Sequence, residues 1–507
     1  AATNAFNTGN LTYNINNAST LLLSTGAASN PTAQGMVVNF DSNGGGTLTL
    51  DSGLNFLLQN TGFFINTNGG AQNTLAGGGF LNDQGTNTPV FFNIASGSNS
   101  TADFLVTGGM GRAAITKNGT GKLLFTTANV GTFGAGITDI RINAGTMEFG
   151  GGVTLILNPG YVFANNATLS WNSTGNQTIA NAMTGTGNLT KSNTSTLTLS
   201  GNNTYTGVTT INAGTLQIGA GGTSGSLSAS SAITNNGTLT FNRTDEVTQG
   251  THFASTISGT GNVTQNGIGT LAPPGNNTYT GATTINTGTL QIGAGGTSGS
   301  LSSSSSITNN ATLVFNRTDS ITQGTHFNNV IAGTGALIQA GSGTVTLSGN
   351  NTYSGATTIN AGTLAVTGNI SSSASTIASG ATLDGTGRVG AVTVSGTLAG
   401  TLTTANITVS SGGLLTPGGN GSVGTIAAGN ITLSAGSGYA WTLANATGAA
   451  GTGFDQVTGT GALTLSNTAA SPFTVYVFGN ATNWSGNTTS WNIISAASQS
   501  GFSSGNF

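Results

Sequence analysis

The seven-residue stretch GNNTYTG decides how this chain is read. It stands at residues 201–207 and 275–281, and in the form GNNTYSG at residues 349–355. Its tyrosines, Tyr205, Tyr279 and Tyr353, are evenly spaced, since 279 − 205 and 353 − 279 both equal 74. The stretch contains no acid, base or thiol, and its Gly and Asn residues accept the backbone angles of tight corners. We interpret it as a corner with Asn side chains stacked along the axis and the Tyr hydroxyl in water.

Other segments keep the same period. Four copies of one segment stand at residues 115–125, 189–199, 263–273 and 337–347, with Lys117, Lys191, Gln265 and Gln339 in register. Four copies of INAGTL or a close variant stand at residues 142–147, 211–216, 285–290 and 359–364. Such self-similarity at a fixed period indicates a repeat architecture.

Within one period the sequence reads as short strands. GTLQI places Leu216 and Ile218 on one face, and GTLTF does the same with Leu239 and Phe241. Turns rich in Gly, Asn and Ser end each strand after about four to six residues. No apolar pattern at helical spacing occurs.

Strands too short to be stable alone, recurring about every 20 to 25 residues, predict an all-β protein in which each coil hydrogen-bonds to the coils before and after it. Each period is expected to form about three coils, which would place the three tyrosines along one line. The whole chain is expected to form a single elongated parallel β-solenoid, or β-helix, of roughly 20 to 25 coils.

Composition supports an ordered fold with an uncharged surface. Only 4% of the 507 residues are charged, whereas about a quarter is typical of a globular domain. Gly contributes 84 residues, but hydrophobic residues make up 36% and offset the entropy of ordering the chain. The surface is therefore expected to consist of Thr, Ser, Asn and Gly.

The same numbers exclude several classes of partner. A net charge of −3 offers no basic patch for nucleic acid or anionic lipid. No run of 18 apolar residues occurs, so we expect no membrane-spanning helix, and the absence of Cys removes disulfides and thiolate metal sites. The chain begins Ala-Ala-Thr without a basic and apolar leader, as a secreted protein does after its signal peptide is removed.

One long stretch resembles a known family. TLTLSGNNTYTGVTTINAGTLQIG (196–219) resembles the autotransporter-associated β-strand repeat of bacterial surface proteins of the autotransporter passenger type and of related secreted proteins. Residues 381–400, 412–426 and 453–466 resemble the end of such passengers. The resemblance implies a passenger-like β-helix that is extracellular or at the bacterial cell surface.

The resemblance covers residues 115 to 466 and suggests three regions. We predict a less regular N-terminal β section or cap over residues 1–114, a solenoid with 74-residue repeats over residues 115–380, and a C-terminal solenoid section with an end region over residues 381–507. The chain after Ser466 is shorter than the membrane-inserting end of a complete autotransporter. We therefore expect a released passenger, a fragment, or a relative exported another way.

β-Helical enzymes that act on polysaccharides need two or three carboxylates, or Arg and Lys, close together on one face. The eleven acids of this chain are scattered: Asp41, Asp51, Asp83, Asp103, Asp139, Glu148, Asp245, Glu246, Asp319, Asp384 and Asp455. Asp245 and Glu246 are adjacent, and neighbours in a strand point to opposite faces.

One ionisable cluster recurs with the period. FNRTD (241–245 and 315–319) is followed by QGTHF (249–253 and 323–327). A functional interpretation is a metal or sugar site that uses Asp245 with His252, and Asp319 with His326. We favour a structural loop in which Arg243 pairs with Asp245, and Arg317 with Asp319, because a catalytic site is seldom duplicated together with its loop.

FDSNGGG (40–46) resembles an Asp-x-Asn-Gly calcium loop but lacks the remaining ligand pattern and the terminal Glu. Asn-x-Ser/Thr triplets such as Asn188-Leu-Thr190 are frequent in a chain this rich in Asn and Thr, so they do not predict glycosylation. We assign no catalytic, cofactor-binding or metal-binding residue, and no cofactor.

The ends of a solenoid carry unpaired backbone groups that can template another chain, and natural solenoids cap them with polar or charged residues. Residues 1–15 and 490–507 contain no Lys, Arg, Asp or Glu. We therefore predict a structural protein that assembles head to tail with copies of itself into an extracellular filament or surface fibre. The first alternative is a monomeric adhesin that binds glycans or a host surface, and the second is a β-helical polysaccharide enzyme.

Overall fold

The computed structural model describes most of the chain from residue 137 onward and a series of segments before it. The described residues are 10–15, 20–23, 32–33, 35–40, 45–58, 63–67, 71–82, 89–97, 102–108, 110, 113–126, 137–254, 256–327, 330–419, 421–468, 470–484 and 490–501.

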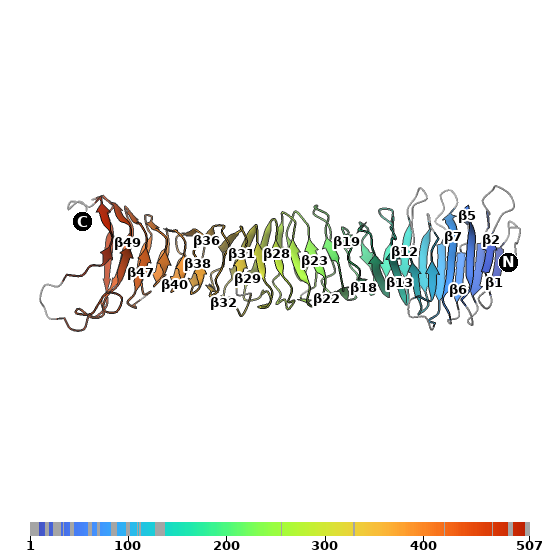
Figure 1. Ribbon diagram of the computed structural model, residues 1–507, viewed down its shortest axis with the longest axis horizontal. Coiled ribbons are helices and arrows are strands. Elements are labelled where there is room, and N and C mark those ends of the chain that lie inside the picture. Colours follow the sequence, from blue (N-terminus) through green and yellow to red (C-terminus); the bar gives the residue numbers. More distant parts are fainter. Residues whose placement is uncertain are drawn as a thin grey trace. The chain divides into compact units, whose positions relative to one another are not determined.

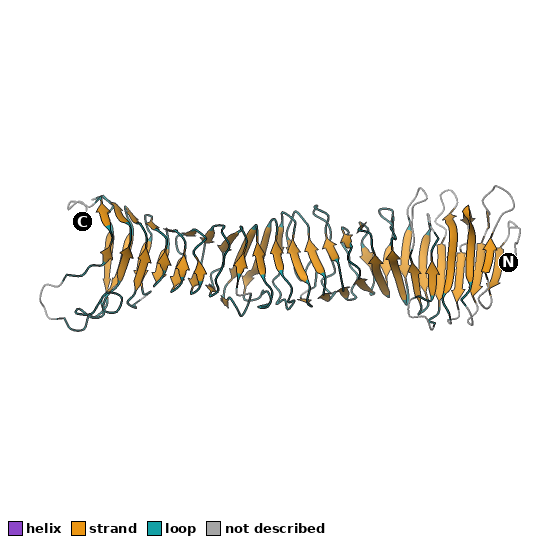
Figure 2. Ribbon diagram, in the orientation of Figure 1, coloured by secondary structure: helices purple, strands orange, loops and turns teal. Residues whose placement is uncertain are grey.

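The described residues are all-β and form two compact units. The first consists of residues 1–245 and 249–262, and the second of residues 246–248 and 263–507. Every pairing between named strands is parallel, and the described residues contain no helix, and hence none that could cross a membrane. Figures 1 and 2 show the short strands of each unit stacked side by side, with turns at their ends. The predicted parallel β-solenoid is confirmed.

In the first unit, two sheets run through most of the coils and a third begins later. The first sheet contains β1 (Asn10–Ile15), β4 (Gly35–Phe40), β6 (Phe63–Thr67), β8 (Pro89–Ile94), β10 (Ala114–Asn118), β12 (Asp139–Ile142), β14 (Phe163–Asn165) and β17 (Met183–Thr184). The second contains β2 (Thr20–Leu23), β5 (Thr47–Leu58), β7 (Asn73–Asn82), β9 (Phe104–Val106), β11 (Lys122–Phe125), β13 (Thr146–Gly151), β15 (Thr168–Ser173), β18 (Asn188–Lys191), β20 (Thr209–Ile211), β22 (Ile233–Asn235) and β25 (Ile257–Ser258), with β3 (Thr32–Ala33) paired to β5. The third contains β16 (Gln177–Ile179), β19 (Thr196–Leu199), β21 (Thr215–Ile218) and β23 (Thr238–Phe241).

The second unit passes through three sheets per coil over most of its length. Its first strands are β26 (Asn262–Gln265), β28 (Thr283–Ile285), β30 (Ile307–Asn309) and β33 (Ile331–Ala332). A 12-stranded sheet contains β24 (Val247–Thr248), β27 (Thr270–Ala272), β29 (Thr289–Gly296), β31 (Thr312–Arg317), β34 (Ala336–Gln339), β36 (Thr357–Ile359), β39 (Ser375–Ile377), β42 (Val392–Val394), β45 (Ile407–Val409), β48 (Ile431–Ser434), β51 (Ala462–Ser466) and β54 (Ser498–Ser500). An 8-stranded sheet contains β32 (Ser320–Thr322), β35 (Thr344–Leu347), β37 (Thr363–Val366), β40 (Thr382–Gly385), β43 (Thr397–Gly400), β46 (Leu414–Pro417), β49 (Gly438–Thr442) and β52 (Thr474–Phe478). A 6-stranded sheet contains β38 (Asn369–Ile370), β41 (Arg388–Val389), β44 (Thr403–Thr404), β47 (Thr425–Ala428), β50 (Gln456–Gly459) and β53 (Ile494–Ser495).

The core consists of apolar columns that run from coil to coil. Leu216 lies opposite Leu239 and Ile218 opposite Phe241 in the register of β21 and β23. All four side chains are fully buried, as the alternation of GTLQI and GTLTF predicted. Burial of each such side chain contributes roughly 1.5 to 3 kcal/mol, so the columns stabilise strands that are too short to persist alone.

Glycine is required at the corner that ends each INAG or INTG segment, where it is the last residue of the segment. Gly214 has φ of 68°, and a Cβ there would lie 2.3 Å from the carbonyl oxygen of Asn193 in the coil below. Gly288 and Gly362 have φ of 65° and 59° and equally close backbone neighbours. A side chain would therefore disfavour both the backbone angle and the stacking of the coils.

Asparagine side chains form a ladder across the first sheet, near the carboxyl ends of its strands. The amide nitrogen of Asn66 donates to Asn39 Oδ1, and that of Asn93 donates to Asn66 Oδ1, both over 2.8 Å. Asn118 and Asn143 continue the chain of donors at 2.9 Å each. Stacked Asn side chains therefore do occur, but not at the GNNTYTG corners where they were predicted. There, Asn203 bonds backbone groups instead, donating to Gly201 O over 2.9 Å.

The expectation that the repeated tyrosines have their hydroxyls in water is wrong. Tyr205, Tyr279 and Tyr353 are at most 1% exposed. The hydroxyl of Tyr205 lies 2.7 Å from Thr209 Oγ1, which lies 3.1 Å from Ser231 Oγ in the next coil. The same triad recurs as Tyr279–Thr283–Ser305 and Tyr353–Thr357–Ser373. Burial is possible because each phenol finds a partner inside the core.

The period does not contain a whole number of coils. In the first unit Leu189 is followed in register by Thr209, Ile233 and Ile257, so three coils take 257 − 189 = 68 residues and 6 of the 74 remain. Those residues carry the chain on to the next sheet. β10 accordingly lies in the first sheet, whereas β18, its equivalent one period later, lies in the second.

The expectation that the three tyrosines lie along one line is therefore also wrong. The backbone N–H of Tyr205 donates to Met183 O in β17, whereas that of Tyr353 donates to Ile331 O in β33, which belongs to another sheet. The division into regions 1–114, 115–380 and 381–507 stays a prediction.

Candidate functional site

The recurrent Arg–Asp loop is a closed structural unit in its first copy. Arg243 follows β23 and is 4% exposed. Its Nε and Nη2 donate to Asp245 Oδ1 and Oδ2 over 2.8 and 2.6 Å, and its Nη1 donates to Gly225 O over 2.7 Å. This bidentate bond lowers the pKa of Asp245 below its usual value. The guanidinium thus fixes the loop 219–225 against the corner after β23.

The second copy repeats this geometry. Arg317 binds Asp319 over 2.8 and 2.6 Å and also donates to Gly299 O and Thr297 O. His326 Nδ1 accepts a backbone hydrogen bond from Thr322 over 3.1 Å. The local pairing of Arg with Asp is the arrangement expected of a structural loop. Within the described ranges, no three His, Asp or Glu residues lie close enough together to hold a metal ion.

Three further acids with described side chains lie apart, each with its own partners. Glu148 pairs with Lys122 over 2.7 Å, and Asp139 with Arg141 over 3.3 Å. Asp103 accepts backbone N–H groups of Gly97 and Lys122. The stretch FDSNGGG includes residues 41–44, which lie outside the described residues together with Asp83. The described acids thus form no paired-carboxylate site.

The side chain at one repeated position holds the bend that follows its own strand, in a different sheet each time: Lys117, Lys191, Gln265 and Gln339. Lys191 Nζ donates to the carbonyl oxygens of Ser192, Asn193 and Ala213 over 2.5, 2.8 and 3.4 Å. Lys117 makes the same three bonds one period earlier. Burial lowers the pKa of both lysines to about 8. In the later copies Gln265 and Gln339 each donate their amide to two carbonyls of the bend.

The last coil of the second unit carries the feature that sequence reasoning missed. β52 (TVYVF) is the terminal strand of its 8-stranded sheet and pairs with β49 alone among the described strands. Its side chains are exposed on both faces: Val475 by 38%, Tyr476 by 50%, Val477 by 66% and Phe478 by 51%. The available signal was a strand with apolar residues at successive positions, which departs from the alternation of strands such as β21 and β23.

One face of β52 continues the core columns of the coil, and the other continues the outer surface of the sheet. Val475 and Val477 lie opposite Tyr439 and Trp441, which belong to the core. They therefore end the core columns without being covered by described residues. Tyr476 lies opposite Ala440, on the outer face of the sheet.

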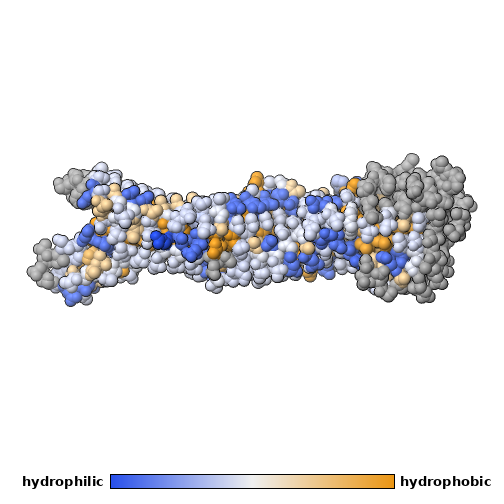
Figure 3. Space-filling model, in the orientation of Figure 1, coloured by the Kyte–Doolittle hydropathy of each residue, from blue (hydrophilic) through white to orange (hydrophobic). Residues whose placement is uncertain are grey.

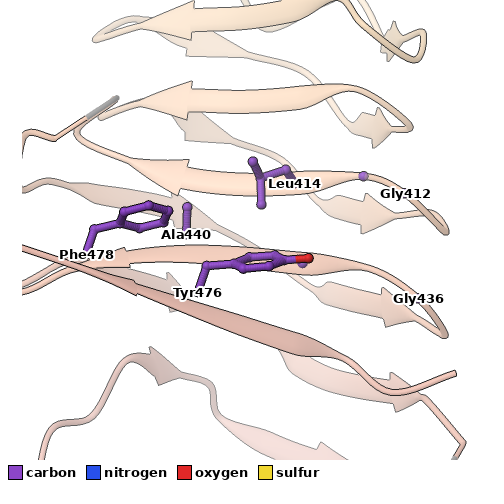
Figure 4. A pocket seen from close by; sticks show the side chains of 8 residues that line it. Gly412, Leu414, Gly436, Ala440, Tyr476 and Phe478 are labelled. Atoms are coloured by element: carbon purple, nitrogen blue, oxygen red, sulfur yellow. The ribbon is translucent and has the colours of Figure 1, made fainter.

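Two shallow hollows lie on that outer face. One, of about 370 Å³, is bordered by Gly412, Gly438, Ala440, Tyr476 and Phe478. The other, of about 400 Å³, shares Leu414, Ala440 and Phe478 with it and extends to Asp384 and Thr397. Figure 4 shows the rings of Tyr476 and Phe478 on the same side of the sheet as Leu414 and Ala440. Small residues at positions 438 and 440 make room for the two rings.

A buried carboxylate supports the coil beneath β52. Asp455 accepts backbone N–H groups of Gly424 and Thr442, each over 2.7 Å, and Trp441 Nε1 donates to Asp455 O over 2.9 Å. Asp455 is fully buried, and desolvation raises its pKa to about 6 although the two N–H donors oppose this shift.

The rest of the described surface is mostly polar and almost uncharged, with single exposed apolar side chains such as Ile268 and Trp484. Figure 3 shows pale colours over most of one face, with small blue and orange patches. This agrees with a charged fraction of 4%. The surface thus offers hydroxyls and amides rather than a charged patch.

Comparison with known proteins places the chain among surface proteins. The passenger-associated transport repeat matches residues 189–218, 263–292 and 337–366. A stretch of 92 residues is 42% identical to part of the adhesin BmaC autotransporter of Brucella suis biovar 1 (strain 1330), which is 18% of this chain and 2% of that protein. The chain therefore spans only a small part of that relative. No solved structure matches it.

The matched repeats contain the Tyr–Thr pairs of the buried triads together with Lys191, Gln265 and Gln339, so the shared pattern is the pattern that builds the coil. The chain thus carries three repeats similar to those of autotransporter passengers within a parallel β-solenoid, and these similarities indicate a secreted or cell-surface protein.

Proposed function

We propose that the protein is a structural, non-enzymatic element of the cell surface that associates head to tail through its last coil. The observation that carries this proposal is the exposure of Val475 and Val477, which end core columns and yet are 38% and 66% exposed. Covering the exposed parts of these two side chains contributes roughly 1.5 kcal/mol or more in total, so the last coil favours a further coil beneath it.

The occupant that fits is the first coil of a second copy. β1 and β2 begin their sheets and pair with β4 and β5 on one side only, as far as the described strands extend. A strand added beside β52 in the parallel direction would continue the pairing used within each unit. Because the surfaces that meet are different, the contact does not close and continues from copy to copy.

A charge at the exposed core position tests this proposal. Val477→Lys should abolish association, because Lys at an open strand edge opposes pairing with another chain. Val208→Lys is the matched control, since Val208 is 41% exposed and belongs to the first unit. Sedimentation velocity of both variants and of the unchanged chain over a range of concentrations measures the outcome. A single species at every concentration for the unchanged chain would contradict the proposal.

A second candidate function is adhesion, which the similarity to a protein named an adhesin favours. In that case a side face rather than an end binds the target. Val477→Lys should then leave binding to host cells intact, whereas a purely structural protein would show no such binding. The two functions are compatible, because the end and the outer face of the last coil are different surfaces.

A further inference from the structure

We propose that the outer face of β46, β49 and β52 is a binding site for neutral carbohydrate, with Tyr476 and Phe478 as its aromatic platform. This inference rests on the adhesion function proposed above and names its ligand class and its site.

The platform is built by strand geometry. Positions 476 and 478 are two residues apart in β52, so both side chains project from the same face about 6.6 Å apart along the strand. They are 50% and 51% exposed, although aromatic rings of this size are usually covered. The electron-rich faces of such rings attract the C–H groups that line one side of a sugar ring.

Polar groups suited to sugar hydroxyls lie beside the rings. Asp384, Thr397 and Thr416 line the larger hollow, on the outer positions of β40, β43 and β46. Asp384 Oδ1 accepts the N–H of Gly385, and its second oxygen has no partner within the described part of the chain. The hydroxyls of Thr397 and Thr416 also make no hydrogen bond there. Each hydroxyl can both donate and accept, and the free carboxylate oxygen can accept.

The charge of the lining decides which carbohydrates fit. Among the residues that border the two hollows, Asp384 is the only charged one, and none is Lys, Arg or His. A uronate or sulfated sugar would meet a carboxylate with no cation to offset it. The site therefore favours neutral oligosaccharides.

The geometry also separates this face from a peptide site. An extended peptide adds to the edge of a sheet, where backbone N–H and C=O groups are free. The face of β46 and β49 has its backbone groups engaged in the ladder on both sides, since β46 pairs with β43 and β49, and β49 with β46 and β52. On the face itself only side chains are offered to a ligand, and these are aromatic rings, hydroxyls and a carboxylate. The free backbone groups of β52 lie at its open edge, where a strand of a second copy is proposed to add, and not on this face.

To test this inference, the full chain is titrated with cellohexaose, chitohexaose and maltohexaose. Isothermal titration calorimetry and ligand-observed NMR measure the binding. Polygalacturonate serves as the anionic probe. At least one neutral oligosaccharide should bind, and each of Tyr476→Ala and Phe478→Ala should weaken that binding at least about tenfold, which corresponds to about 1.4 kcal/mol. Tyr476→Phe should retain it, because the ring face is kept.

Controls separate loss of the site from loss of the fold. Tyr161→Ala removes a ring that is 40% exposed in the first unit and should leave binding unchanged. Thr416→Val keeps the shape of the side chain but removes its hydroxyl, so weakened binding in this variant would support the site even if the alanine variants unfold the last coil.

Stronger binding of polygalacturonate than of the neutral probes would overturn the inference, as would no binding of any neutral probe. Carbohydrate binding that survives in Val477→Lys would support this site even if head-to-tail association fails. Adhesion to cells without any binding of these sugars would leave adhesion standing and refute the site.

Discussion

At the scale of single residues, the repeated sequence positions are devices for placing polar groups inside a narrow core. A buried tyrosine is tolerated because Thr and Ser relay its hydroxyl bond, and a buried lysine because three carbonyl oxygens surround its ammonium group. Sequence reasoning found these positions from their register. The predicted position of the tyrosine hydroxyl was wrong, because the sequence around a tyrosine at a corner is the same whether the hydroxyl contacts water or a threonine.

Replacement of Lys191 tests the role of the buried ammonium group. Lys191→Gln should change the free energy of unfolding by less than about 1 kcal/mol, because Gln265 bonds the same bend in the next repeat. Lys191→Met should cost about 2 kcal/mol or more, since it leaves buried carbonyls without a donor. Urea unfolding of the two variants measures the difference. Equal destabilisation by Gln and Met would show that the bonds to the bend contribute nothing.

The buried Asp455 predicts a pH dependence of the last coils. Its folded pKa is about 6, above its usual 3.8, so the protonated form is favoured by folding. The stabilisation is complete below the unfolded pKa and is lost as the pH rises through 6. Between pH 5 and pH 7.5 the loss should be about 1.4 kcal/mol.

Urea unfolding followed by tryptophan fluorescence at both pH values measures this loss, since Trp441 packs against Asp455. Asp455→Asn is the comparison variant, and its stability should be lower but nearly independent of pH over this window. A wild-type protein that is more stable at pH 7.5 than at pH 5 would contradict the assignment.

At the scale of elements, the strand pattern was predictable and the angular position of each strand was not. Alternation in GTLQI and GTLTF correctly identified Leu216 and Phe241 as core residues. The extra 6 residues per period are invisible to a repeat count, because only the register of β18, β20, β22 and β25 shows where a coil closes. The asparagine ladder was missed for a related reason, since its members are 25 or 27 residues apart, a spacing unlike the 74-residue period, and Asn39, Asn66 and Asn93 lie before the regular repeat.

Substitution within the asparagine ladder should give an effect that depends on position. Asn93→Ala removes two ladder bonds, one to Asn66 and one from Asn118, and should cost about 2 kcal/mol. Asn143→Ala removes one ladder bond, the one to Asn118, and should cost about half as much. Chemical denaturation of the two variants provides the comparison. Equal effects would show that the ladder does not act as a chain of bonds.

At the scale of the whole molecule, the last coil ends two core columns at Val475 and Val477 without covering them by described residues, which leaves an open end. The absence of charge at either end suggested such openness from the sequence. The sequence could not show where core columns end uncovered. Val475 and Val477 resemble other core valines until the strand register places them at the ends of such columns.

A cysteine at the open end distinguishes the possible symmetries of association. The chain contains no Cys, so Val477→Cys introduces a single reactive thiol. Head-to-tail contact places position 477 against the first coil of another copy, and mild oxidation should therefore yield few covalent dimers. Efficient disulfide dimers on a non-reducing gel would indicate a symmetric tail-to-tail contact instead.

Cryo-electron microscopy of the purified chain at increasing concentration tests head-to-tail association most directly. We expect end-to-end chains of uniform polarity, with β52 of one copy beside the first strands of the next copy and parallel to them. Isolated molecules at every concentration, or pairs joined through two copies of β52, would contradict it.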